Sequence, residues 1–191
     1  MEKKTKIKTC RIAAFCLVLS GLAAVFASAQ SVPVVGRAEV SFVYNKQGGF
    51  ASNQFAVWIE DSRGRHVKTL YATRFTAAGG WKKRELSLPL WVKQAGVGGM
   101  NKSQIDALTG PTPRSGTLRY VWDGTDQAGL AAAAGSYRVF VEAALRNENS
   151  VLYTADINLG ASGVVTPSPR YVGSGTAERG MIGQVSIRFD R

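Results

Sequence analysis

Apolar and polar side chains alternate in several short blocks of this chain, and turn-forming residues separate the blocks. A period of two is typical of strands that bury one face and expose the other. The alternating blocks are Val40 to Tyr44, Phe55 to Ile59, Tyr137 to Ala143 and Val185 to Phe189. We therefore expect a mostly antiparallel β structure.

Two of these strands are expected to continue into hairpins. Asp61 to Gly64 precedes a further apolar run, Val67 to Tyr71, and Asn147 to Ser150 precedes Val151 to Leu159. Asp, Asn, Gly and Ser favour tight turns because they adopt the left-handed backbone conformation readily or because their side chains form hydrogen bonds with the nearby main chain. In each hairpin the two runs are therefore predicted to pair.

The alternation stops between Leu86 and Arg114. The only helix we expect lies there, from Leu88 to Ala95, with Pro89 in its first turn. A second stretch, Gly160 to Gly180, is rich in Gly, Ser and Pro, which predicts a mobile loop. The last strand then either closes a sheet edge or pairs with a partner. The fold class is all-β, a sandwich with one short helical or irregular insertion.

Residues 1–29 are not expected to belong to the fold. Basic residues precede an apolar run, Ile12 to Phe26, and Ala27 to Ala29 supply the small side chains that a signal peptidase reads. The run is shorter than the ~20 residues needed to span a bilayer, and Cys16 lacks a lipoprotein signal. We expect a cleaved signal peptide, export to the periplasm or beyond, and one domain over residues 30–191 that does not itself span the membrane.

Removal of this leader changes the charge and the cysteine content. The chain loses five of its 24 basic and one of its 13 acidic residues, so the net charge falls from +11 to +7. Cys10 and Cys16 leave with the leader, so no disulfide is expected. The basic residues that remain could form a face toward lipid, an acidic partner or a phosphate, or a solvated surface of mixed charge. The residues in question are Arg63, Arg65, Lys68, Lys82, Lys83 and Arg84.

The segment from Tyr120 to Val139 carries a recognisable hairpin pattern. Trp122, Asp123 and Gly124 are followed by Asp126, Gly129, Gly135, Ser136 and Tyr137. This pattern resembles the second hairpin of the immunoglobulin-like domain in flagellar hook-capping proteins, and Phe55 to Leu70 resembles the first. The resemblance implies an immunoglobulin-like or fibronectin-III-like antiparallel sandwich. We expect the two aspartates to hold the loop's own amides and the two large aromatic residues to cap the core.

Residues 37–160 as a whole resemble an uncharacterised bacterial family of exported single-domain proteins. The resemblance rests on the Asp61, Arg63, Gly64 turn, on Trp91, on Asp106 to Gly116 and on the Trp122 to Glu142 hairpin. Members of that family are often encoded beside PepSY-type membrane proteins and FAD:protein FMN transferases. The resemblance therefore implies an envelope or membrane protein partner, in a membrane redox or metal-uptake system.

One motif suggests a covalent cofactor. FMN transferases attach flavin to a Ser or Thr in a motif resembling Asp-x-x-Ser/Thr-Gly-Ala-Ser/Thr. Asp106, Thr109, Gly110 and Thr112 stand at the matching positions, so Thr112 would be the acceptor. Pro111 departs from the motif, and its fixed φ either spoils recognition or leaves the segment extended. The alternative is a surface turn in which Asp106 caps backbone amides.

A flavin on Thr112 would make the protein an electron carrier, because the redox chemistry belongs to the cofactor. Trp81, Trp91 or Trp122 could stack on the ring, although burial in the core is favoured for tryptophans of a sandwich. His66, a single histidine among basic residues, is interpreted as a solvated strand residue. No zinc site, no twelve-residue calcium loop at Asp123 and no nucleic-acid motif is expected.

Three functions remain open from the sequence. The first is a non-catalytic immunoglobulin-like module of the bacterial envelope that binds a partner. The second is a covalently flavinylated electron carrier, and the third is a flagellar hook-assembly module. Export by a cleaved signal argues against the third, because hook-capping proteins leave through the flagellar apparatus.

Overall fold

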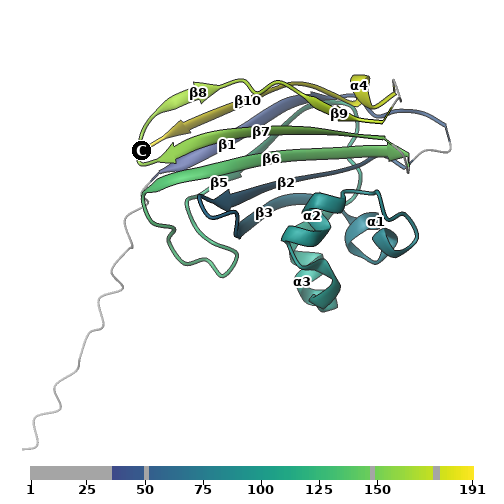
Figure 1. The fold of residues 1–191 in the computed structure, drawn as a ribbon, viewed down its shortest axis with the longest axis horizontal. Coiled ribbons are helices and arrows are strands. Elements are labelled where there is room, and N and C mark those ends of the chain that lie inside the picture. The colour runs from purple at the N-terminus through teal and green to yellow at the C-terminus, as the bar shows by residue number, and fades with distance from the viewer. Residues whose placement is uncertain (1–35, 50–51, 147–148, 174–176) are drawn as a thin grey trace, which may run out of the picture. The chain divides into compact units, whose positions relative to one another are not determined.

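The computed structural model describes residues 36–49, 52–146, 149–173 and 177–191. The predicted signal peptide lies outside these ranges. Within them, two β-sheets pack face to face, and three short helices lie together on the outer side of the larger sheet (Figure 1). The expectation of an all-β sandwich is confirmed.

The smaller sheet has four strands in the order β5-β1-β10-β8, which span Gly116–Trp122, Arg37–Tyr44, Ile182–Asp190 and Gly163–Val165. The larger sheet has six in the order β4-β3-β2-β6-β7-β9. They span Thr109–Gly110, His66–Thr73, Gln54–Asp61, Gly135–Arg146, Asn149–Leu159 and Arg170–Val172. Every pairing is antiparallel except that of β3 with β4. Both predicted hairpins, β2–β3 and β6–β7, are confirmed.

The main core lies between the sheets and is formed by the alternating residues of the sequence pattern. Phe42 of β1 meets Phe55 of β2 edge to face, with ring centroids 5.8 Å apart. Trp122 and Tyr137 lie 4.8 Å apart and are both buried, so the predicted aromatic cap is confirmed. The loop between them is held as expected, because Asp123 accepts from the Thr125 amide and Asp126 from two amides further along.

A second core lies on the outer side of the larger sheet. Trp58 of β2 is completely buried there and stacks on Phe140 of β6, with centroids 4.7 Å apart and an interplanar angle of 5°. Trp91 and Leu88 come down from the helical layer and are also fully buried. Strand β2 is therefore buried on both faces, which explains its nearly continuous apolar sequence.

The helical layer is longer than the insertion predicted at Leu86 to Arg114. It begins at Arg74 and contains α1 (Arg74–Ala77), α2 (Pro89–Gln94) and α3 (Lys102–Leu108), with 3-10 turns at Gly80–Lys82 and Val97–Gly99. The short helix after Leu88 is confirmed as α2. The other helices were not expected, although Asn101 and Gln104 form a capping box that marks the start of α3.

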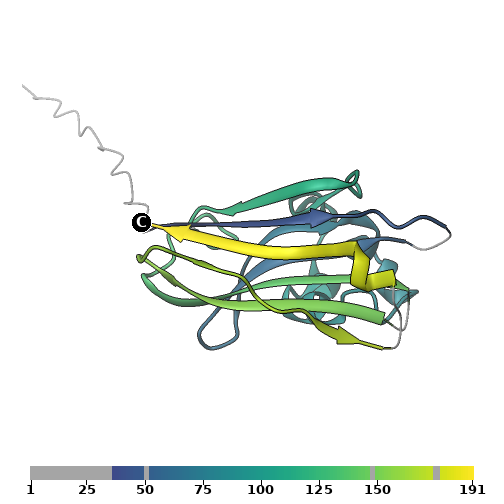
Figure 2. The same ribbon diagram turned by 90° about the horizontal axis from the view of Figure 1, so that it is seen from above.

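The stretch Gly160 to Gly180 also differs from the expected loop. Its residues form β8 and β9, which extend the two sheets, and α4 (Ala177–Met181) begins within it. The last strand, β10, lies between β1 and β8 (Figure 2). The last strand was expected to close a sheet edge or to pair with a partner; β8 pairs with Ile187–Phe189 instead, so β10 is not the last strand of its sheet.

Candidate functional site

The flavin motif is divided between a helix and a strand. Asp106 lies in α3, Thr109 and Gly110 form β4 beside β3, and Thr112 follows, half-buried, in the segment that leads to β5. The first half of the motif therefore has regular structure and is not the surface turn given as the alternative. The second half, from Pro111 to Ser115, has no regular structure.

Asp106 takes part in ion pairs and does not cap amides. Its carboxylate lies 2.6 Å from Lys102 Nζ and 2.6 Å from Arg74 Nη1. Hydrogen bonds from Lys102 and then Arg74 lower the pKa of this carboxyl. The capping role expected for Asp106 is filled by Asn101, whose side chain accepts from the Gln104 amide. Asp106 thus fastens α3 to α1.

Tyr71 fixes the segment that carries Thr112. Its hydroxyl donates a 2.6 Å hydrogen bond to the Pro111 carbonyl. A Cβ added at Gly110 would lie 2.8 Å from Tyr71 Cε2, so this position has room only for glycine. Thr112 is half-buried and makes no side-chain hydrogen bond among the described residues.

Two of the three candidate tryptophans are unavailable to a flavin. Trp91 and Trp122 are completely buried, which confirms the favoured expectation that they belong to the core and leaves neither ring open to a flavin. Trp81 is half-buried, and Lys82 Nζ lies 5.5 Å from the centre of its ring. The aromatic side chain nearest the motif is instead Tyr71, which stacks on Phe55 at 5.1 Å.

The six basic residues do not form one free surface. Arg65 pairs with Asp61 at 2.7 Å, and Lys68 pairs with Asp123 at 2.8 Å. Arg84 is half-buried and donates to the Leu145 carbonyl at 2.9 Å. Lys82 lies over Trp81, whereas Arg63 and Lys83 are exposed. Lys68 therefore ties the β5–β6 loop to β3, and Arg84 ties the helical layer to β6.

His66 is half-buried on β3, so it is less solvated than expected. Its Nε2 lies 2.8 Å from Thr69 Oγ1, and the same hydroxyl accepts from Trp91 Nε1 at 3.0 Å. Burial lowers the His66 pKa to about 4. The residue is therefore neutral at physiological pH, part of a chain of polar groups that joins β3 to α2.

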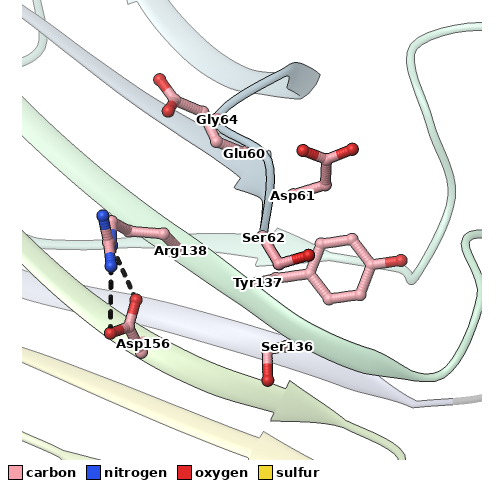
Figure 3. A pocket seen from close by; sticks show the side chains of 8 residues that line it. All are labelled: Glu60, Asp61, Ser62, Gly64, Ser136, Tyr137, Arg138 and Asp156. Carbon is pink, nitrogen blue, oxygen red and sulfur yellow. Dashed lines mark hydrogen bonds and ion pairs between the residues drawn. The ribbon is translucent and has the colours of Figure 1, made fainter.

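A pocket of about 210 Å³ lies beside the β2–β3 turn (Figure 3). Arg138 and Asp156 point toward each other from β6 and β7, with Nε–Oδ1 and Nη2–Oδ2 distances of 2.6 and 3.2 Å. Glu60 accepts from Trp58 Nε1 at 2.8 Å, and Asp61 holds the turn. Within the described ranges no three acidic, histidine or cysteine groups are arranged to hold a metal.

A buried carboxylate that no sequence motif singles out, Glu142, lies under α2. Glu142 is 4% exposed, and its oxygens accept from the Leu90 amide at 3.3 Å and the Trp91 amide at 2.9 Å. Burial raises its pKa to about 7. Leu88 before these amides has a strained left-handed backbone, with φ 56° and ψ 51°. In the sequence Glu142 appears as an outward polar position, and only the helical layer buries it.

The sheet edges differ in length. β4, β8 and β9 end their sheets with two or three residues each, whereas β5 has seven. In the described part of the chain no strand pairs with the outer edge of β5. Thr117, Arg119 and Val121 are exposed on this strand.

These features define a small β-sandwich protein with one helical layer and a seven-residue edge strand, β5. The chain belongs to the DUF2271 family, described as a predicted periplasmic protein, whose model matches residues 37–174. The periplasmic location expected from the leader is thereby confirmed. The comparisons with curated proteins and with solved structures find no match. The resemblance to hook-capping domains therefore stays a prediction. No helix in the described ranges has the length and apolarity to cross a membrane.

Proposed function

We propose that this protein is a non-catalytic module of the bacterial envelope that binds another envelope protein along β5. The observation that carries the proposal is the edge strand β5 itself, whose seven residues pair with β1 on one side and with no strand of the described chain on the other. Unpaired backbone groups on an edge strand are a ready template for a strand of another chain, and short edges suppress such pairing. A component of a membrane redox or metal-uptake system is the partner that the family resemblance favours.

A photo-crosslinking residue at position 121 tests this proposal. Val121 on β5 is 53% exposed, and Val164 on the opposite edge strand, β8, is 59% exposed, so position 164 is a matched control. We expect a discrete adduct in the envelope from position 121, with slower amide exchange of residues 117–121 in the complex. Val121→Lys should abolish the complex and Val164→Lys should not. Equal crosslinking from both positions, or none, would contradict the proposal.

The second candidate is a covalent FMN on Thr112, which would make the module an electron carrier. It is supported by the half-buried Thr112 without a side-chain partner among the described residues, in an irregular segment next to the binding edge. The transferase would join Thr112 Oγ1 to the FMN phosphate of FAD, with AMP as the leaving group and the hydroxyl proton released. A flavin in this position would lie beside the partner that β5 binds.

Intact mass and visible absorbance test the second candidate in cells that express an FMN transferase. We expect a mass gain of one FMN and a yellow protein, both lost in Thr112→Ala and kept in Thr117→Ala, which alters an exposed threonine nearby. Pro111→Ala restores the usual motif and should increase the yield. A colourless protein in both the wild type and Pro111→Ala would exclude the flavin and leave the β5 proposal intact.

A further inference from the structure

A second pocket lies where the helical layer meets the far side of the larger sheet. Its volume is about 190 Å³, and it opens between the start of α2 and the strands β6, β7 and β9. Leu86, Leu90, Leu152 and Val172 supply aliphatic walls, while Glu142 and Arg170 supply opposite charges. It shares no residue with the flavin motif or with β5.

Glu142 retains the capacity to bind a donor from this pocket. Each carboxylate oxygen has two lone pairs, and each oxygen accepts only one hydrogen bond from the α2 amides. A buried carboxylate is costly unless its charge is compensated. The raised pKa shows that the two amides and the nearby Arg170 do not fully replace water. An ammonium group in the pocket would complete the compensation.

The walls of the pocket favour an aliphatic ligand. Leu86 is 51% exposed and Val172 is 47% exposed, although both are large apolar residues, and Leu152 of β7 is buried at the same pocket. Apolar groups lining a pocket with a few placed polar groups are the usual composition of a small-molecule site. Pockets for drug-sized ligands measure ~300–1,000 Å³, so this one suits a smaller molecule.

Arg170 supplies the positive charge of the pocket. It is exposed on β9, interacts electrostatically with Glu142, and forms no ion pair within the described ranges. A simple amine would be repelled by its guanidinium group, and a simple fatty acid would be repelled by the Glu142 carboxylate. A zwitterion satisfies both groups at once, since guanidinium forks bind carboxylates with two parallel hydrogen bonds.

We propose that this pocket binds a free α-amino acid with an aliphatic side chain, such as leucine. Its ammonium group bonds to Glu142, its carboxylate to Arg170, and its side chain packs against Leu86, Leu152 and Val172. The ends of a longer peptide do not fit, because a peptide's amino and carboxyl groups are not on the same carbon.

The proposal is tested by NMR titration of the full processed protein with four ligands: leucine, leucinamide, 4-methylpentanoate and glycine. Leucine should give saturable shifts of the Leu90 and Trp91 amides. The three analogues lack the carboxylate, the ammonium group and the side chain respectively, and should bind at least ~10-fold more weakly. Absence of saturation by leucine at about 10 mM, or equal binding of leucine and leucinamide, would overturn the proposal.

Two substitutions assign the charges. Arg170→Gln alters an exposed side chain, so it should keep the fold and weaken leucine binding ~10-fold or more, with little effect on leucinamide. Glu142→Gln should weaken leucine and leucinamide alike. Arg188→Gln, an exposed arginine on β10 of the other sheet, is the control and should change neither. Unchanged leucine affinity in Arg170→Gln would overturn the assignment even if Glu142→Gln fails to fold.

Discussion

The Trp91 amide donates a 2.9 Å hydrogen bond to Glu142 Oε2, and this bond fastens the start of α2 to β6. The two residues are 51 positions apart in the sequence, and their bond joins the helical layer to the larger sheet. Because the accepting carboxyl is buried, its protonation state is coupled to the stability of the fold.

Glu142 should make the protein less stable as pH rises. The folded state holds the Glu142 proton more tightly than the unfolded chain, since burial raises its pKa from 4.5 to about 7. Stability is therefore lost between these pH values, by about 2 to 3 kcal/mol. Glu142→Gln should remove this loss, at a pH-independent cost of about 1 kcal/mol for an amide donor left without an acceptor. Urea unfolding across this pH range measures the free energy of unfolding of the wild type and of Glu142→Gln, and Glu85→Gln, at an exposed position, is the control.

His66 should act in the opposite direction. Burial lowers its pKa from 6.5 to about 4. Between these pH values the His66 imidazole is therefore protonated in the unfolded chain and neutral in the folded state. Stability is lost as pH falls between these values, by about 2 to 3 kcal/mol at most. His66→Gln should remove that loss and leave the fall caused by Glu142 unopposed. A wild-type profile nearly flat between pH 4.5 and 6.5 is expected, and equal profiles of wild type and His66→Gln would contradict this account.

Gly110→Ala should destabilise the protein by about 1 to 3 kcal/mol, because the added methyl group overlaps Tyr71. The matched control is Gly99→Ala in the 3-10 turn after α2, where nothing lies within 4 Å of the added Cβ. Thermal unfolding compares the two. If the two variants have the same melting temperature, then the close contact between Gly110 and the Tyr71 ring does not exclude a larger side chain at position 110.

Tyr71→Phe should loosen the Pro111 to Ser115 segment while leaving the core intact. The variant loses the 2.6 Å bond to the Pro111 carbonyl, worth about 0.5 to 1.5 kcal/mol, but keeps the ring on Phe55. Hydrogen exchange of amides 109–118 should accelerate. Tyr153→Phe, which removes a 3.0 Å bond to the Ile182 carbonyl, is the control and should change exchange near α4 and β10 instead.

The sandwich could be predicted from the sequence because its strands alternate with a period of two and its hairpin turns use Asp, Asn and Gly. The helical layer was largely missed, since α1 has only four residues and begins directly after β3. Its apolar residues, Leu88 and Trp91 among them, are spread through turns and show no regular period.

Among the site residues, too, those with local contacts could be predicted from the sequence, and those with distant contacts could not. Asp123 and Asp126 act within their own loop, so local pattern identified their role. Glu142 and His66 appear polar and outward-facing in their strands, but Glu142 is buried under α2 and His66 is half-buried. Asp106 was assigned to a turn because its partner Arg74, 32 positions earlier, lies in a helix that was not expected.

The pairing of β1 with β10, in which Arg37 faces Asp190, has a consequence for export. The central pair of the smaller sheet joins segments from the two ends of the described chain. Folds dominated by such distant contacts form slowly. Strand β1 can pair with β5 on one side before the end of the domain is available, but its other side stays unpaired until β10 is available, so the smaller sheet is completed only with the last strand.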